Sequence, residues 1–300
     1  WVLYVTALAT VLAQQYVPLP PLRQQAVEQQ SWLTERLDVT LPALMKEYGI
    51  STWLLLMQEH AEDTVFWSMK IPTQFAARRR TLMLHYFEND VIKHQTIVNF
   101  TDQMWIELRD TLDRVNPQNI ALNTDNVIAF ADGLHSGQKE ILMTELGEYA
   151  SRVVYQPLLA VNFIALKPPS MLSRYKQMME NVHTIIEEGF SKAVITPGVT
   201  TTQDVIWWFR DKVQAIGLTV WFQPSVGIIG RNGPIPSDVI MKGDLIWCDF
   251  GIIAMGLRTD TQHMGYILRD GEQDAPRGLK EGLLKSNRMQ DILVEEIKPG

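Results

Sequence analysis

The sequence of 300 residues contains a single cysteine, Cys248, and no basic run longer than the three arginines at positions 78–80. One cysteine excludes both an intramolecular disulfide framework and a cysteine-cluster zinc site. The net charge is −7 at pH 7, from 27 Lys and Arg against 34 Asp and Glu. Nucleic acid and anionic membranes are bound by basic surfaces that neutralise phosphates. We therefore expect neither of them as a partner.

Apolar runs long enough to cross a membrane are also lacking. The apolar run at residues 1–13 (WVLYVTALATVLA) is too short, because a spanning helix takes about 20 residues. Its composition is typical of the apolar part of a secretory leader, so residues 1–15 are predicted to be a partial signal peptide of a secreted or periplasmic protein. A buried amino-terminal strand or helix is the alternative. The missing initial Met and the final Pro299-Gly300 turn signal lead us to expect a fragment, open at both ends.

What is present is an ordinary globular composition, with 18 Gly and 15 Pro, arranged in alternating helical and strand periodicities. This alternation between residues 25 and 166 predicts an α/β domain. The Lys-Pro-Pro sequence at 167–169 interrupts the pattern, and we place a domain boundary there. The predicted elements of this domain are helices over 25–50 and 105–115 and strands over 52–57, 80–87, 94–98 and 119–123.

The region 170–300 has a different pattern, in which long helices flank a series of strands. The sequence I-x-P-G follows a predicted helix twice, at 195–198 and at 297–300, which indicates an internal duplication. Thr200 and Gln203 are predicted to form a capping box. The predicted elements are helices over 170–191, 201–215 and 276–296 and strands over 220–223, 244–253 and 257–268.

Two aspartates, Asp249 and Asp260, flank a predicted hairpin whose tight loop lies at 254–256. A turn centred on Ala254 and Met255 would place them directly opposite each other, with Cβ atoms about 4.5–5.5 Å apart. Like charges at this separation need a cation or a shared proton, which predicts a divalent metal site. A turn at Met255 and Gly256 would offset the pair by two residues. A solvated pair at the strand ends is the alternative to a metal site.

The sequence around these aspartates resembles two patterns of the pita-bread metallopeptidases, a family that includes Xaa-Pro aminopeptidases and prolidases. The first is G-D-L-I-W-C-D-F-G at 243–251, and the second is G-L-R-T-D-T-Q-H at 256–263. The resemblance implies a creatinase-type α/β domain at 25–166 and the first half of a duplicated α+β pita-bread domain at 170–300. It also implies that Asp249 and Asp260 are the first two of five ligands to two divalent ions, with Asp260 bridging them. Manganese is the expected metal, with cobalt or zinc as alternatives.

The function that the resemblance implies is metal-dependent hydrolysis of the bond before proline, in a peptide with proline at its second position. A homodimer is also compatible with it. An inactive module that binds peptide or protein is one alternative, and a creatinase-like amidinohydrolase without metal is another. In the family a His and two Glu complete the ligand set beyond the position of Gly300. We therefore expect residues 1–300 alone to bind metal weakly and to be inactive.

The sequence departs from the family in the segment 230–237, where Ser237 takes the place of a substrate-handling histidine. Serine does not exchange a proton near neutral pH as imidazole does, so no catalytic residue is assigned. Asn232 and Ser237 are candidates for contact with substrate, although Asn232 beside a glycine also suits a turn. Thr261 and His263 are candidates for a place beside the metal ligands, and an ordinary packed histidine is the alternative. A regular strand would put His263 on the face opposite Asp260.

Overall fold

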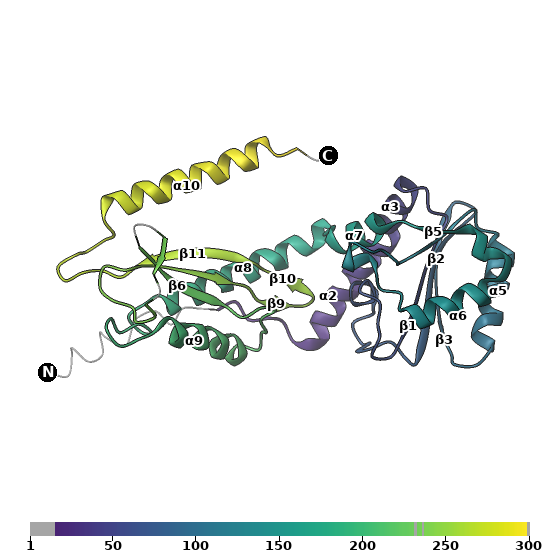
Figure 1. Ribbon diagram of the computed structural model, residues 1–300, viewed down its shortest axis with the longest axis horizontal. Helices are drawn as coiled ribbons and strands as arrows, with labels where there is room; N and C mark the ends of the chain where they lie inside the picture. The colour runs from purple at the N-terminus through teal and green to yellow at the C-terminus, as the bar shows by residue number, and fades with distance from the viewer. Residues whose placement is uncertain (1–15, 231–232, 236, 299–300) are drawn as a thin grey trace. The chain divides into compact units, whose positions relative to one another are not determined.

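The computed structural model describes residues 16–230, 233–235 and 237–298 and divides into two compact units. The amino-terminal unit comprises Leu19–Arg174. The carboxy-terminal unit comprises the chain from Tyr175 onward together with the segment that ends at Pro18. Each unit is built on a sheet of its own (Figure 1). Within the described residues, no helix is both long enough and apolar enough to span a bilayer.

The amino-terminal unit contains a five-stranded mixed sheet in the order β3-β2-β1-β4-β5. The central strand β1 pairs antiparallel with β2 and parallel with β4. The outer pairs are antiparallel β2–β3 and parallel β4–β5. The strands are β1 (Thr52–Gln58), β2 (Arg80–Glu88), β3 (Val91–Val98), β4 (Ile120–Leu122) and β5 (Val153–Tyr155). The strands and the two helical regions predicted for this part of the chain are confirmed.

Helices cover both faces of this sheet, because the central strand is apolar on both sides. Trp53, Leu55 and Met57 lie in the core beneath α3 and α7. Leu54 and Leu56 lie in the core on the other face, beneath α5 and α6. The helical segments are α2 (Leu22–Glu35), the π-helical η1 (Arg36–Thr40), α3 (Leu41–Glu47), α4 (Phe66–Met69), α5 (Gln103–Val115), η2 (Ala129–Ala131), α6 (Ser136–Leu146), η3 (Gly147–Arg152) and α7 (Pro157–Ala165).

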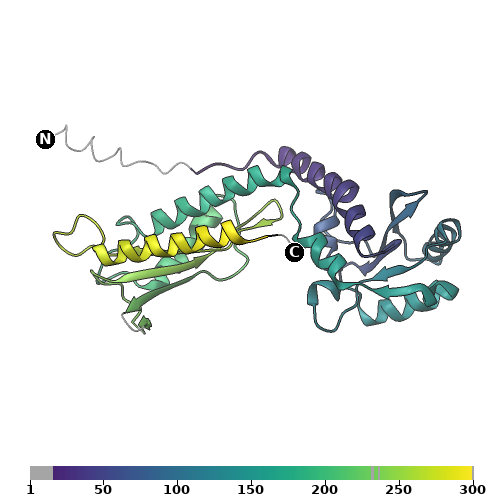
Figure 2. The same ribbon diagram turned by 90° about the horizontal axis from the view of Figure 1, so that it is seen from above.

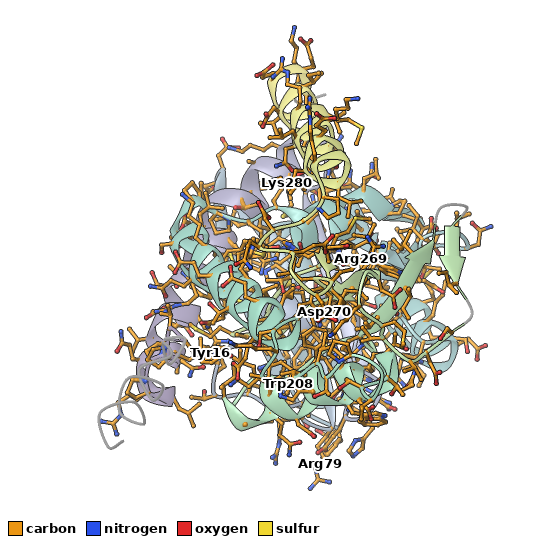
Figure 3. The ribbon with its side chains drawn as sticks, turned by 90° about the vertical axis from the view of Figure 1, so that its left-hand side faces the viewer. Tyr16, Arg79, Trp208, Arg269, Asp270 and Lys280 are labelled. Atoms are coloured by element: carbon orange, nitrogen blue, oxygen red, sulfur yellow. The ribbon has the colours of Figure 1, made fainter. Side chains whose placement is uncertain are left out.

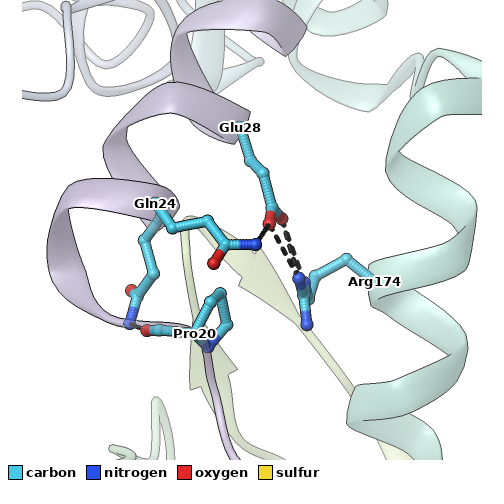
Figure 4. A network of polar contacts seen from close by, with 5 residues as sticks. Pro20, Gln24, Glu28 and Arg174 are labelled. Atoms are coloured by element: carbon cyan, nitrogen blue, oxygen red, sulfur yellow. Dashed lines mark hydrogen bonds and ion pairs between the residues drawn. The ribbon is translucent and has the colours of Figure 1, made fainter.

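An ion pair joins α2 to the start of α8 (Pro169–Gly189) (Figure 4). The Arg174 guanidinium donates through Nη2 to both carboxylate oxygens of Glu28, each at 2.9 Å. Gln24 Nε2 donates to the same carboxylate at 3.2 Å. Forked pairs of this kind hold both side chains in one geometry. The first residues of α8 therefore belong to the amino-terminal unit.

The carboxy-terminal unit contains a four-stranded antiparallel sheet in the order β11-β8-β6-β7. Its strands are β6 (Ser225–Gly230), β7 (Gly233–Ile235), β8 (Leu245–Phe250) and β11 (Thr261–Tyr266), and a short hairpin adds β9 (Ile253–Ala254) and β10 (Leu257–Arg258). The strand predicted over 220–223 is wrong, since the ladder begins at Ser225. In this segment Trp221 does not pair in the ladder and instead donates through its ring nitrogen to the Thr259 carbonyl.

Helices α8 and α9 (Thr202–Ala215) pack on one face of this sheet (Figure 2). Ile246, Cys248 and Phe250 alternate toward these helices and are buried. The Phe250 ring stacks on Phe209 of α9, with 4.9 Å between the ring centroids. In α10 (Arg277–Glu296), the yellow helix of Figure 1, no residue is buried.

The capping box of α9 differs from its prediction by one residue. Thr201, and not Thr200, is the N-cap, and Asp204 is its partner in place of Gln203. Asp204 N–H donates to Thr201 Oγ1 at 3.1 Å, and Thr201 N–H donates to the Asp204 carboxylate at 2.8 Å. The Thr200 hydroxyl accepts a hydrogen bond from the Thr196 N–H instead, and so stabilises the turn that precedes the helix.

The amino-terminal end of the described chain is held against α8 and α9 in the carboxy-terminal unit. Asn181 of α8 pairs with Val17 in both directions, with its side chain accepting the Val17 N–H at 2.8 Å and donating to the Val17 carbonyl at 2.9 Å. Tyr16, labelled in Figure 3, donates to Glu188, which also pairs with Lys212 of α9. The predicted signal peptide, residues 1–15, lies outside the described residues.

A buried polar network closes the end of the amino-terminal sheet where β1 and β4 finish. Asn123, directly after β4, accepts from Trp53 Nε1 at 2.8 Å and donates to both carboxylate oxygens of Asp63 at 3.1 Å. Val65 N–H donates to Asp63 Oδ1 at 2.8 Å. The Asp63 side chain is wholly buried, and this burial raises its pKa to about 6.

The raised pKa of Asp63 predicts that the stability of this unit falls between about pH 4 and about pH 6. An acid with a raised folded-state pKa holds its proton more tightly in the folded state, so the loss is complete above that pKa. The shift from 3.8 to about 6 corresponds to about 3 kcal/mol. Urea unfolding across this range should show the fall for the native chain and for the exposed-residue control Asp110→Asn. Asp63→Asn should unfold with much less pH dependence, and an unchanged pH profile would contradict the assignment.

Candidate metal centre

The hairpin that separates Asp249 from Asp260 turns at Met255 and Gly256. Both residues have positive φ, at 51° and 81°, and Leu257 pairs with Ala254 across the turn. Two-residue hairpin turns of this kind match the twist of the flanking strands, and Gly256 adopts the conformation without a Cβ penalty. The predicted hairpin is confirmed, but its centre lies one residue later than Ala254 and Met255.

This displacement of the turn changes the partner of Asp249. Asp249 pairs with Gln262, and Phe250 pairs with Thr261. The expectation that Asp249 and Asp260 lie directly opposite each other is therefore wrong, because moving a turn by one residue moves the register by two. The offset of two residues that a turn at Met255 and Gly256 implies is the register observed. Asp260 lies diagonally from Asp249 and not directly across the ladder.

The two carboxyl groups nevertheless interact. Burial raises the pKa of Asp249, and the neighbouring carboxyl group of Asp260 raises it further. Asp249 Oδ1 is buried and has no hydrogen-bond partner among the described residues. Its other oxygen, Oδ2, is 3.5 Å from Gln262 Nε2. A buried carboxylate oxygen without a donor costs free energy unless a cation or a proton satisfies it.

Asp249 lies on the face of the sheet that α8 and α9 do not cover. Side chains alternate along β8, so the burial of Cys248 toward the helices puts Asp249 on the other face. Met264 shares that face and is 63% exposed, and Asp260 and Gln262 are exposed as well. Cys248 is the buried thiol that the sequence predicts, and burial raises its pKa to about 12. Solvent can therefore reach this face of the sheet at Asp260 and Gln262, while the Cys248 thiol is buried on the other face.

Thr261 and His263 lie together on the helix side of β11, away from the face of Asp249. Thr261 Oγ1 and His263 Nε2 are 2.8 Å apart. The His263 ring contacts His183 of α8 edge-on, with 4.8 Å between centroids. Burial lowers the pKa of His263, and His183 lowers it further. These contacts favour packing against α8 over a direct place beside the metal ligands.

The two candidate substrate residues lie in the segment between β6 and β8. Asn232 is outside the described residues, so its role stays a prediction. Ser237 is described and is exposed. It makes no contact with the aspartates that the structure records, and its role as a substrate contact likewise stays a prediction.

The pair of aspartates makes an incomplete site. Across residues 16–230, 233–235 and 237–298, no group of three or more His, Cys, Asp or Glu is placed to hold a metal ion. Two carboxylates supply hard oxygen ligands, which suit manganese or magnesium. The unpartnered buried oxygen of Asp249 fits such a cation. The described residues therefore supply two carboxylates to a cation, but not the three or more ligands that would hold it firmly.

Gln262 is a neighbour of the site that the sequence reasoning missed. It lies directly across the ladder from Asp249, and its side-chain nitrogen is 3.5 Å from Asp249 Oδ2. Glycine is favoured at the central positions of two-residue hairpin turns, so Gly256 indicates a turn at Met255 and Gly256. Counting the register from that turn identifies position 262.

Comparison with solved structures shows what fold these units make. An aminopeptidase P from E. coli aligns with a TM-score of 0.57 and 10% identity, over 92% of this chain and 69% of its own. An X-Pro aminopeptidase from Thermotoga maritima aligns at 0.55 and 15%, over 80% and 67%. A prolidase from Pyrococcus horikoshii aligns at 0.54 and 14%, over 89% and 73%. No protein-family model matches the sequence, and no curated protein matches it significantly.

At these identities the alignments show a shared fold. The chain has the pita-bread type of fold found in Xaa-Pro peptidases, with a mixed α/β unit ahead of it. The fold that the sequence patterns at 243–251 and 256–263 imply is thus confirmed. The alignments cover most of this chain; Asp249 lies in strand β8 of that fold, and Asp260 directly precedes strand β11.

Removing one charge of the pair should relieve repulsion. We expect Asp260→Asn to lower the pKa of Asp249 toward its ordinary value, because the neighbouring negative charge is one cause of the shift. At neutral pH and without added metal, it should stabilise the carboxy-terminal unit by about 0.2–1 kcal/mol, the range for cross-strand pairs. The pKa is measured by NMR titration of the Asp249 carboxyl and the stability by urea unfolding. Asp238→Asn, at an exposed aspartate of the same unit, is the control; an unmoved Asp249 pKa would contradict the contact.

Proposed function

We propose that this chain belongs to a divalent-metal-dependent peptidase that cleaves the bond before proline, with Asp249 and Asp260 as two of the metal ligands. One observation carries the proposal. Two interacting carboxyl groups, one with a buried oxygen that lacks a donor, lie on the uncovered sheet face of a fold shared with Xaa-Pro peptidases. A sheet has no structural need for such a pair, because like charges on neighbouring strands destabilise it.

The residues of the site have distinct tasks in this proposal. Asp249 holds a cation through Oδ1, while Gln262 restrains its other oxygen. Asp260, which is exposed, would supply the second carboxylate to the metal ions. A pair of divalent ions lowers the pKa of a shared water and polarises the scissile carbonyl. Manganese is the proposed metal, with cobalt or zinc as alternatives, because carboxylate oxygens are among the ligands that suit manganese.

The substrate class rests on the structural neighbours, which are described as X-Pro aminopeptidase, prolidase and aminopeptidase P. A peptide with proline at its second position is the substrate that we propose. Ser237 in place of an imidazole indicates that proton transfer near the substrate relies on another group. Export of the protein rests on residues 1–15 and, like a homodimer, stays a prediction.

Metal titration tests the site itself. We expect the 300-residue chain to bind Mn²⁺ with a Kd on the order of 10⁻⁴ M or weaker, as sites with few charged ligands do. Asp249→Asn combined with Asp260→Asn should abolish this binding, and Asp238→Asn should leave it unchanged. Isothermal titration with Mn²⁺ measures the affinities. Binding at micromolar Kd with peptide hydrolysis by this chain would contradict an incomplete site, and absence of all binding would contradict the site.

Peptide hydrolysis tests the activity in the protein that contains these residues. We expect an Ala-Pro peptide to lose its first residue, chelator to stop the reaction, and Mn²⁺ to restore it. Asp260→Asn should lower kcat/KM by more than about 100-fold, beyond the range for residues that only orient ligands. Binding of the peptide without hydrolysis at saturating Mn²⁺ would instead support the inactive binding module.

A further inference from the structure

We propose that Trp221 is a positioning residue for Asp260, acting through the main chain of Thr259. This proposal deepens the proposed function, because Asp260 is a ligand of the proposed metal centre. It is carried by hydrogen bonds that lie entirely within the carboxy-terminal unit. Trp221 is remote from both sequence patterns that identify the aspartates.

The ladder between the two arms of the hairpin is interrupted just where Asp260 lies. β8 ends at Phe250 and β9 begins at Ile253, while β10 ends at Arg258 and β11 begins at Thr261. Asp260 is thus outside any strand, in a two-residue break. Backbone groups in such a break lose their ladder partners, and buried ones need replacements.

Thr259 supplies part of the replacement. Its N–H donates to the Ile252 carbonyl at 3.0 Å, and its hydroxyl accepts the Ile252 N–H at 3.0 Å. The residue is fully buried, so these bonds are shielded from water. Two bonds to one residue on the opposite arm hold the residue that directly precedes Asp260.

Trp221 supplies the remaining donor. Its ring Nε1–H donates to the Thr259 carbonyl at 2.9 Å. Indole nitrogen is a donor only, so the direction of this bond is fixed. The Trp221 segment is itself anchored, because the neighbouring Thr219 accepts the Ile253 N–H at 2.7 Å. The carbonyl that begins the Thr259–Asp260 peptide bond is therefore held from outside the hairpin.

Gly251 shows how closely these groups approach. A Cβ at this position would lie 2.1 Å from the Thr259 carbonyl oxygen and 2.9 Å from Trp221 Nε1. Only glycine lets the two arms and the indole meet at this point. Gly251 follows Asp249 by two residues, and Thr259 precedes Asp260 by one. The contact thus joins the two arms of the hairpin on the turn side of both aspartates.

The test is Trp221→Phe in the full chain, with Trp207→Phe as the matched control. Phenylalanine keeps a ring but removes the N–H, and Trp207 is an exposed indole on α9. Hydrogen exchange followed by mass spectrometry reports on the segment 251–262, and Mn²⁺ titration reports on the cation site. We expect Trp221→Phe to speed exchange of this segment at least about fivefold and to weaken Mn²⁺ binding about tenfold. Trp207→Phe should change neither quantity.

Each outcome has a definite consequence. Unchanged exchange in Trp221→Phe overturns the positioning role, and faster exchange with unchanged Mn²⁺ affinity shows that Trp221 acts on local structure only. If the native chain binds no Mn²⁺, the proposed function fails while the exchange result still decides whether Trp221 fixes the Thr259–Asp260 segment. Where Trp221→Phe does not fold, the Trp221 ring N–H is followed in the native chain by NMR. It should exchange more slowly than free indole although 44% of the residue is exposed, and free-indole exchange overturns the proposal.

Discussion

The repulsion between the carboxyl groups of Asp249 and Asp260 is the constraint around which the carboxy-terminal unit is arranged. Like charges on adjacent arms of a hairpin destabilise a sheet, and a buried carboxylate oxygen without a donor adds to the cost. The unit offsets this cost on the opposite face, where Ile246, Cys248 and Phe250 are buried against α8 and α9. A stable apolar face thus supports a polar face that is unfavourable until a cation or a proton is bound.

Alternation along the strands keeps these two faces apart. In β8 the even-numbered positions face the helices and the odd-numbered ones face away, so Asp249 and its buried neighbour Cys248 have opposite environments. In β11 the pairing of Gln262 with Asp249 puts Thr261 and His263 on the helix side. A slip of one residue would exchange the faces and bury both charges. The turn at Met255 and Gly256 is therefore as important to the site as the aspartates.

Local periodicity predicted most of the fold because the apolar residues of the core strands and helices recur at the spacing of the element that they form. Strand β1 is apolar on both faces and could be identified from its sequence alone. The details that the sequence did not predict depend on contacts between distant residues. The segment 220–223 has the composition of a strand, but it does not pair in the sheet, and the ring of Trp221 donates a hydrogen bond to the Thr259 carbonyl. The N-cap of α9 was predicted one residue early because positions 200 and 201 are both threonine, and either could cap the helix by its sequence. They differ only in the N–H groups that their hydroxyls accept in the folded chain.

The same distinction applies to the candidate site. The two aspartates could be found from the spacing of their motifs, but their geometry depends on a break in the ladder that no local pattern reveals. Three polar bonds replace the missing ladder bonds there, and one of them comes from a residue 38 positions away in the sequence. A site whose ligands repel each other needs such external support, because the ligands do not hold themselves in place. The hairpin supplies the charges, and the segment around Trp221 supplies the rigidity that keeps them together.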